Sequence, residues 1–362
     1  MSVKKVARIF LLLIILSGPQ VLGEESQEFE VALKPYIETC INCSAVVIKA
    51  EKEVEAAETA YLRARKQGWA AMDIESLAIA YQTARLYAQE MRGQEMIRAV
   101  QRYFALSRAE QELTTAKKKL EIAEQKLKIK ELRLASGLQS TNEVLTEKNL
   151  LLAVEEKKLE AEDEYDQARQ EFFRAIKLEP KSQVFLRIYQ SLNKEPRTYD
   201  LPASLHQLRT TSSKFYSAQS TYTLMKRKRE ALQDPELTTE GERKKVAEEL
   251  RSAEQNLVQA ERATADLAEE LVNDHQSLVR KLQLERRTIE LARHQLTLAK
   301  IQLVNGEILA SDLEQSAVDY QEALERLAQT EGSIYLQELR IAAACGEELW
   351  PLLQYLTVAG DH

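Results

Sequence analysis

Apolar residues recur at steps of three and four positions along two long stretches of the chain, which is the spacing of one face of an α-helix. The first series is Leu113, Ala116, Leu120, Ala123, Leu127 and Leu134, and the second is Leu278, Leu282, Ile289, Leu296 and Leu303. Both series lie in proline-free stretches, residues 36–179 and 236–350, that are rich in strong helix formers. The pattern therefore predicts very long helices.

The predicted elements form two similar halves. We expect helices at about 27–65, 76–135 and 140–178 in the first half, and at about 203–232, 241–304 and 308–345 in the second. A helix of sixty residues would reach ~90 Å, which is longer than a globular domain can surround. Each helix must therefore pack lengthwise against others, in a coiled coil or tubular bundle, and this predicts an oligomer.

A short pattern occurs twice, 169 positions apart, around Gly137 and around Gly306. In both places apolar residues stand 8, 5 and 3 positions before the glycine, a carboxylate stands 6 positions after it and an apolar residue follows. The residues are Ile129, Leu132, Leu134, Glu143 and Val144 in one copy, and Leu298, Ile301, Leu303, Asp312 and Leu313 in the other. Glycine leaves a helix in the left-handed conformation without a Cβ penalty, so each copy predicts a hairpin turn, at 137–141 and 306–310. Both tips are expected at the same end of the molecule.

The two turns resemble the hairpin tips of the TolC family, the outer-membrane factors of efflux pumps and type I secretion systems. The resemblance rests on segments 138–145 and 307–313, and continues in Tyr165 and Tyr335 of the returning helices. It implies an all-α fold of two repeated antiparallel hairpins in a homotrimeric helical tube. A periplasmic adaptor (membrane-fusion protein) and an inner-membrane pump are the implied partners, and the periplasm or outer membrane is the implied location.

The candidate site is the pair of tips. Its residues are Gly137, Thr141, Glu143, Gly306, Ser311 and Asp312. The resemblance implies that three copies of Glu143 and Asp312 converge at a periplasmic entrance, where a ring of acids would favour cations. The alternative is structural: an acid in the first turn of a helix is favoured by the helix dipole, and Thr141 is a candidate cap. Family members with a second acid one turn on differ from this chain, which has Thr146 and Gln315 there.

The chain departs from the family where β-barrel strands are expected. A strand pair would have to fit in residues 66–75 and 233–242, about ten positions each, and neither segment alternates apolar and polar residues as membrane strands do. We therefore expect no barrel, and a mature chain that is soluble or peripherally bound to a membrane. Trp69 lies in the first of these segments, either as a cap on helix packing or as a contact with a membrane surface.

The chain divides into five expected parts. Residues 1–23 read as a signal peptide, with Lys4, Lys5 and Arg8 before an apolar run, and an uncleaved anchor is the alternative. The repeats follow at 24–178 and 203–346, separated at 179–202 by an irregular belt that is either an equatorial domain or a plain linker. Residues 347–362 form a C-terminal tail.

Charge and cysteine content exclude several classes of protein. The formal net charge is −7 for the full chain, and near −10 once the three bases of the leader are removed. Acids and bases alternate along the helices, which argues against a nucleic-acid partner. Cys40, Cys43 and Cys345 are either buried small residues or the source of a disulfide from Cys345 to one of the other two.

No catalytic, cofactor or metal motif is found in the sequence, because the four histidines are scattered and the glycines form no phosphate-binding loop. Two functions remain: an outer-membrane-factor-like conduit or docking element without enzymatic activity, or a non-transporting structural or adaptor coiled-coil protein of the cell envelope. An oligomer that encloses a continuous channel would favour the first.

Overall fold

The computed structural model describes residues 29–31, 33–179, 184–186, 195–232 and 239–357. The expected signal segment 1–23, much of the belt and most of the loop at 233–240 lie outside the described residues.

The expected duplication is confirmed in helix lengths. Helix α4 (Ala71–Ala135) and helix α8 (Glu240–Val304) have 65 residues each, and the returning helices α5 (Thr141–Ala175) and α9 (Ala310–Ala344) have 35 each. In both repeats the element before the long helix is broken in two. The pieces are α2 (Leu33–Cys43) and α3 (Ala45–Gln67) in the first repeat, and α6 (Leu201–Thr211) and α7 (Ser213–Ala231) in the second.

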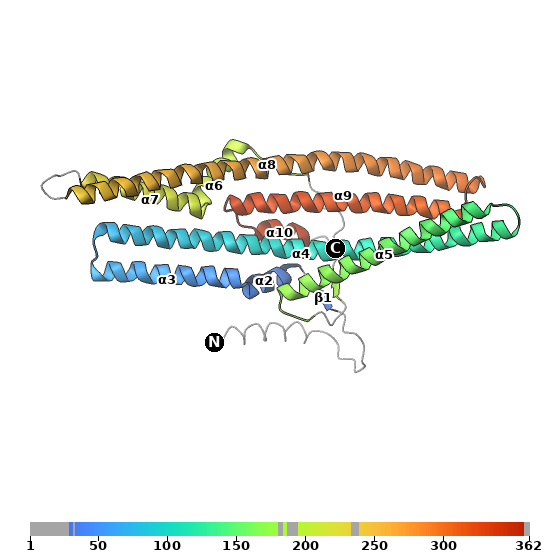
Figure 1. Cartoon of the computed structure of the whole chain (residues 1–362), viewed down its shortest axis with the longest axis horizontal. Coiled ribbons are helices and arrows are strands. Elements are labelled where there is room, and N and C mark those ends of the chain that lie inside the picture. The colour runs from blue at the N-terminus through green and yellow to red at the C-terminus, as the bar shows by residue number, and fades with distance from the viewer. Residues whose placement is uncertain (1–28, 32, 180–183, 187–194, 233–238, 358–362) are drawn as a thin grey trace.

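The helices pack lengthwise into a long rod (Figure 1). At one end the hairpin helices contact one another in the order α5, α4, α9 and α8, and at the other end the order is α3, α4, α7 and α8. The turns α4–α5 and α8–α9 lie at the same end, as expected, and the turn α3–α4 lies at the opposite end (Figure 1). Each long helix therefore contacts one set of helices near the hairpin tips and a different set towards the opposite end of the rod.

The two tip turns have the same backbone geometry. Gly137 and Gly306 both have φ of 73°, in the left-handed region. The N–H of the following residue donates to the carbonyl oxygen five positions earlier, from Leu138 to Arg133 and from Glu307 to Gln302, at 2.9 Å in each case. This is a Schellman-type ending, which satisfies carbonyl groups that the helix leaves open.

The largest cluster of buried apolar residues lies near the middle of the rod, where helix α2 and the C-terminal segment meet the hairpins (Figure 1). Tyr36 stacks on Phe172 with ring centroids 4.0 Å apart, and the Tyr335 hydroxyl donates to the Leu352 carbonyl oxygen at 2.9 Å. Leu352 belongs to α10 (Trp350–Thr357), so the expected C-terminal tail includes a helix that packs into the core. The belt contributes strand β2 (Val184–Leu186), which pairs in parallel with β1 (Phe29–Val31).

The end of the belt is fixed to the second hairpin by buried polar contacts. The Arg197 N–H donates to Glu338 Oε1 at 2.8 Å, and the Tyr199 ring packs edge-on against His275 at 5.0 Å between centroids. His275 and Glu338 are themselves buried, with Nε2 and Oε1 3.6 Å apart. These contacts bind the described part of the belt to α8 and α9.

The three cysteines are free thiols, so the proposed disulfide is not formed in this structure. Cys40 and Cys345 are buried, and burial raises the pKa of each thiol to about 11. This agrees with the alternative interpretation, in which they serve as small core residues.

Residues 66–75 form the end of α3, a turn at Gly68 and the start of α4, without a strand. In the part of the chain that the structure describes, none of the helices has the length and apolar character needed to cross a membrane.

The left-handed tip geometry gives a test of the hairpin turns. Gly137→Ala and Gly306→Ala should each lower the free energy of unfolding by ~1 kcal/mol, because an L-residue is strained at this φ even where space is open. Gly332→Ala, inside α9, should instead raise it by about 0.5–1 kcal/mol through helix propensity. Urea unfolding measures all three; a stabilising effect at either tip would contradict the turn geometry.

Candidate functional site: the hairpin tips

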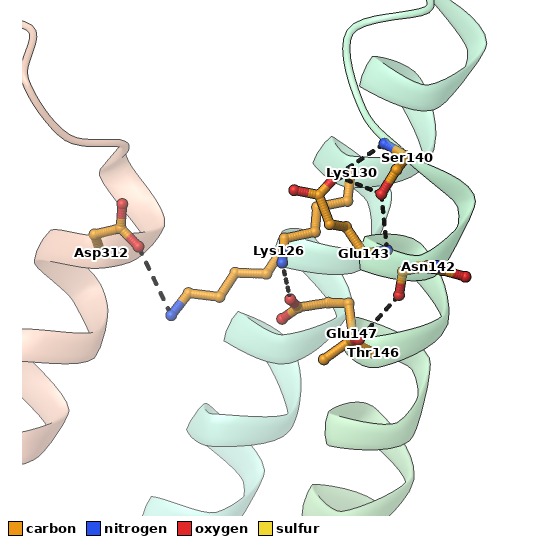
Figure 2. A network of polar contacts seen from close by, with 8 residues as sticks. All are labelled: Lys126, Lys130, Ser140, Asn142, Glu143, Thr146, Glu147 and Asp312. Atoms are coloured by element: carbon orange, nitrogen blue, oxygen red, sulfur yellow. Dashed lines mark hydrogen bonds and ion pairs between the residues drawn. The ribbon is translucent and has the colours of Figure 1, made fainter.

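The first tip is closed by a capping box between Ser140 and Glu143. The Glu143 N–H donates to Ser140 Oγ at 3.3 Å, and the Ser140 N–H donates to Glu143 Oε2 at 2.8 Å. The Ser140 hydroxyl also donates to the same carboxylate oxygen at 2.7 Å (Figure 2). Two backbone N–H groups at the start of α5 are thereby satisfied.

These hydrogen bonds explain the acidity of Glu143. The N–H and hydroxyl of Ser140 stabilise the charged carboxylate, so the pKa of Glu143 lies below its ordinary value. The expectation that Thr141 caps this helix was wrong, because Ser140 holds the cap position and Thr141 is the first helical residue. Serine and threonine are both good caps, and the sequence pattern did not decide between these neighbours.

The second tip is closed differently. Its cap position is occupied by Leu309, which has no side-chain acceptor, and Asp312 Oδ2 instead accepts the Leu309 N–H at 3.2 Å. The neighbouring Ser311 is buried, and its Oγ has no hydrogen-bond partner within the described residues. Asp312 therefore forms only one of the two hydrogen bonds of a capping box, because the Leu309 side chain cannot accept the Asp312 N–H.

Asp312 also connects the two hairpins. Its Oδ1 lies 3.8 Å from Lys126 Nζ on α4, in the other repeat (Figure 2). Further along the same helix pair, Lys119 forms an ion pair with Glu322, and Thr115 Oγ1 donates to Glu325 Oε1 at 2.9 Å. These contacts fix the register of α4 against α9.

The sequence analysis missed the basic partners at the tips. Lys126 pairs with Asp312, and Lys130, one turn further on, pairs with the buried Glu147 of α5 (Figure 2). Lys119 and Lys126 are seven positions apart on α4, a spacing that places them on one helix face and would have indicated the pairing. Glu147 follows Thr146, so this chain does carry a second acid one turn beyond Glu143, turned inward to Lys130.

Within one chain the predicted tip residues have separate partners. Glu143 bonds to its own helix start, whereas Asp312 bonds to its helix start and to Lys126. Figure 2 shows the two acids on different helices, with the lysines of α4 between them. A ring of acids would therefore need side chains from several chains, and Lys126 would lie close to each Asp312.

The two alternative caps of the first tip can be separated by substitution. Ser140→Ala should destabilise the start of α5 by ~1 kcal/mol and raise the pKa of Glu143, because the hydroxyl no longer accepts the Glu143 N–H or donates to the Glu143 carboxylate. Thr141→Ala, the matched control, should change neither by a comparable amount. Amide hydrogen exchange at residues 141–145 and an NMR titration of Glu143 measure these effects; a larger effect of Thr141→Ala would contradict this geometry.

No protein-family model matches the sequence, and a search of curated proteins finds no match. Solved structures do match in fold. The outer-membrane channel CusC has 12% sequence identity and a TM-score of 0.65, covering 92% of this chain and 96% of that chain. CmeC of Campylobacter jejuni has 10% identity and a TM-score of 0.63 over 91% and 90% of the two chains, and VceC of Vibrio cholerae has 14% and 0.60 over 87% and 96%. The resemblance expected from the two tips is thereby confirmed at the level of fold, which is that of the TolC-family outer-membrane channels.

Proposed function

We propose that copies of this chain assemble side by side into a helical tube that serves as a conduit or docking element of an efflux or secretion system. The observation that carries the proposal is a pair of exposed leucine stripes on the outer helices of the hairpin row. Leu145, Leu152 and Leu159 are exposed on α5, and Leu284, Leu291 and Leu298 are exposed on α8. Each stripe has the seven-residue spacing of a coiled-coil seam.

The two stripes cover similar stretches of their hairpins. The α5 leucines lie 8, 15 and 22 residues after Gly137, and the α8 leucines lie 8, 15 and 22 residues before Gly306. Since the two tips are at the same end of the molecule (Figure 1), the α5 stripe of one copy would run alongside the α8 stripe of an aligned copy. The contact joins different surfaces, so it repeats from copy to copy, and we propose that the repeat closes as a ring and not as an open filament.

The internal repeat supports the same pairing. Leu284 and Leu291 of α8 correspond, 169 positions earlier, to Thr115 and Ile122 of α4. Those two residues are buried, and Thr115 bonds to Glu325 of α9. The counterpart of α9 in the first repeat is α5, so α8 should be covered by an α5. The α5 of the same chain is packed on α4, and the covering helix therefore belongs to a neighbouring copy.

The two helix segments that carry the stripes differ in net charge. Residues 143–166 of α5 include nine acidic and three basic side chains, whereas residues 280–304 of α8 include six basic and two acidic ones. Opposite charges beside an apolar seam favour the α5–α8 pairing over α5–α5 or α8–α8 pairing. This favours a head-to-tail contact between copies over a symmetric dimer.

A ring of three copies, the number implied by the family resemblance, would bring three Glu143 and three Asp312 side chains to one end. We propose that end as the entrance and as the docking site for a periplasmic adaptor, with an inner-membrane pump supplying the energy. The chain itself would act without enzymatic activity or cofactor. Export to the periplasm, where such an assembly would work, rests on the signal-like segment 1–23.

A non-transporting structural or adaptor protein is the second candidate, since long helical hairpins also suit that role. The leucine stripes favour the conduit, because a scaffold that acts through separate rods would leave them in water. An assembly without a continuous channel would favour the second candidate.

The assembly can be tested by removing leucines from one stripe at a time. Leu152→Gln and Leu291→Gln should each shift the mature chain from oligomer to monomer, because each places a polar amide in an apolar seam. Leu132→Gln on α4 is the matched control: Leu132 is 62% exposed, close to the 61% of Leu152 and 64% of Leu291, but lies on neither stripe. Sedimentation velocity measures the assembly state; an unchanged oligomer in both stripe variants would contradict the proposed interface.

The tip acids can be tested in the double variant Glu143→Gln and Asp312→Asn. Both amides keep an acceptor for the backbone N–H groups, so the helix starts should form, while the ring would lose its charge. Divalent-cation binding should weaken severalfold, as should docking of an adaptor. The double variant Glu254→Gln and Glu261→Gln, on exposed positions of α8 far from the tips, removes the same charge as a control. Calorimetric titration with Ca²⁺ measures the binding. If the unmodified chain, the tip variant and the control variant bind Ca²⁺ with equal affinity, the two acids serve only to stabilise the helix starts.

A further inference from the structure

The end of the rod opposite the hairpin tips carries a short exposed apolar segment. It is the turn from α3 to α4 (Figure 1). In this turn Trp69, Ala70, Ala71 and Met72 are all exposed in sequence after Gly68. We propose that this turn is a contact site for the surface of an anionic lipid bilayer. The contact needs a single copy of the chain, so it stands or falls independently of the ring.

Trp69 is only half covered by neighbouring residues. Its side chain is 50% exposed, and its indole N–H donates to the Gln67 side-chain oxygen at 3.1 Å within the same turn. Met72, on the first turn of α4, is exposed beside it. An indole with a polar N–H and a large apolar body suits the boundary between lipid headgroups and acyl chains. The structure thus favours the membrane interpretation of Trp69 over the packing interpretation.

Basic side chains surround the apolar segment on the side of α3. Arg63, Arg65 and Lys66 are exposed within the last two turns of that helix. The nearest acids on the side of α4 are Asp73 and Glu75, and Glu75 is paired with Arg227 of α7 at 2.6 Å. A tryptophan next to three cations matches the phosphates of an anionic bilayer, since each basic residue near such a surface adds to the attraction.

The turn is held rigidly enough to present Trp69. Gly68 adopts φ of 66°, and the Trp69 N–H donates to the Ala64 carbonyl oxygen at 3.2 Å. Behind the turn, Tyr61 of α3 stacks with Tyr81 of α4 at 6.2 Å between ring centroids, and Arg65 lies 5.7 Å from the Tyr61 ring. The two helices are therefore joined across their aromatic rings, and little ordering is needed when the turn meets a surface.

The test uses the mature full-length chain and lipid vesicles of two compositions, phosphatidylcholine alone and phosphatidylcholine mixed with phosphatidylglycerol. The chain has two tryptophans, so Trp350→Phe leaves Trp69 as the single indole reporter. On anionic vesicles its fluorescence should shift to shorter wavelength and be quenched by lipids brominated in the acyl chain. The reciprocal variant Trp69→Phe, which reports on Trp350, should show neither change.

Binding should also depend on the named side chains. In co-sedimentation with anionic vesicles, Trp69→Gln should weaken binding severalfold, and Arg63→Gln with Lys66→Gln should weaken it by about thirtyfold. Lys117→Gln with Lys118→Gln, exposed on the middle of α4, is the charge-matched control and should retain binding. The proposal is overturned if the chain fails to bind anionic vesicles, if it binds both compositions equally, or if the Trp69 variant binds as the unmodified chain does. Sedimentation velocity on the same samples reports the assembly state separately, so loss of the ring is not mistaken for loss of the membrane contact.

Discussion

The structure depends on one constraint: two helices of 65 residues cannot be buried by the rest of a chain of 362 residues. At ~1.5 Å per residue each helix is close to 100 Å long, so its apolar positions can be covered only by other helices running beside it. The chain does this with two hairpins and two shorter helix pairs. The row of helices still has two outer members, α5 and α8, with one exposed apolar stripe each. The uncovered stripes are the physical reason for expecting further copies.

The internal duplication turns this constraint into a specific geometry. The contact of α4 with α9 inside the chain, held by Thr115, Lys119 and Lys126, is repeated in principle by a contact of α8 with the α5 of another copy. One such contact joins the two hairpins within the chain, and the other is the contact proposed between copies. The two contacts also differ in the polarity of their side chains. Inside the chain, lysines of α4 meet acids of α9, whereas the exposed stripes are apolar and are flanked by opposite charges.

The sequence was sufficient for the architecture because the strongest signals were long and repeated. Proline-free stretches, three- and four-residue periodicity and the glycine pattern around Gly137 and Gly306 predicted both hairpins and the common end of their tips. It was not sufficient for finer features. The break at Ser44, the cap at Ser140 and the helix α10 depend on tertiary packing or on a choice between adjacent residues. The tip lysines were not predicted, because the pattern around each glycine contains the acids but not the part of α4 that faces them. The exposure of Trp69 likewise needed the structure, since the sequence places tryptophan at a turn without saying which way it faces.

We propose that the exposed stripes close a ring around a continuous passage. Cryo-electron microscopy of the purified, assembled mature chain tests it directly. We expect a closed ring in which the α5 leucine stripe of one copy lies on the α8 leucine stripe of the next, and a water-filled channel runs between the hairpins. Separate rods, a symmetric dimer through α5 alone, or a ring with a solid core would contradict it.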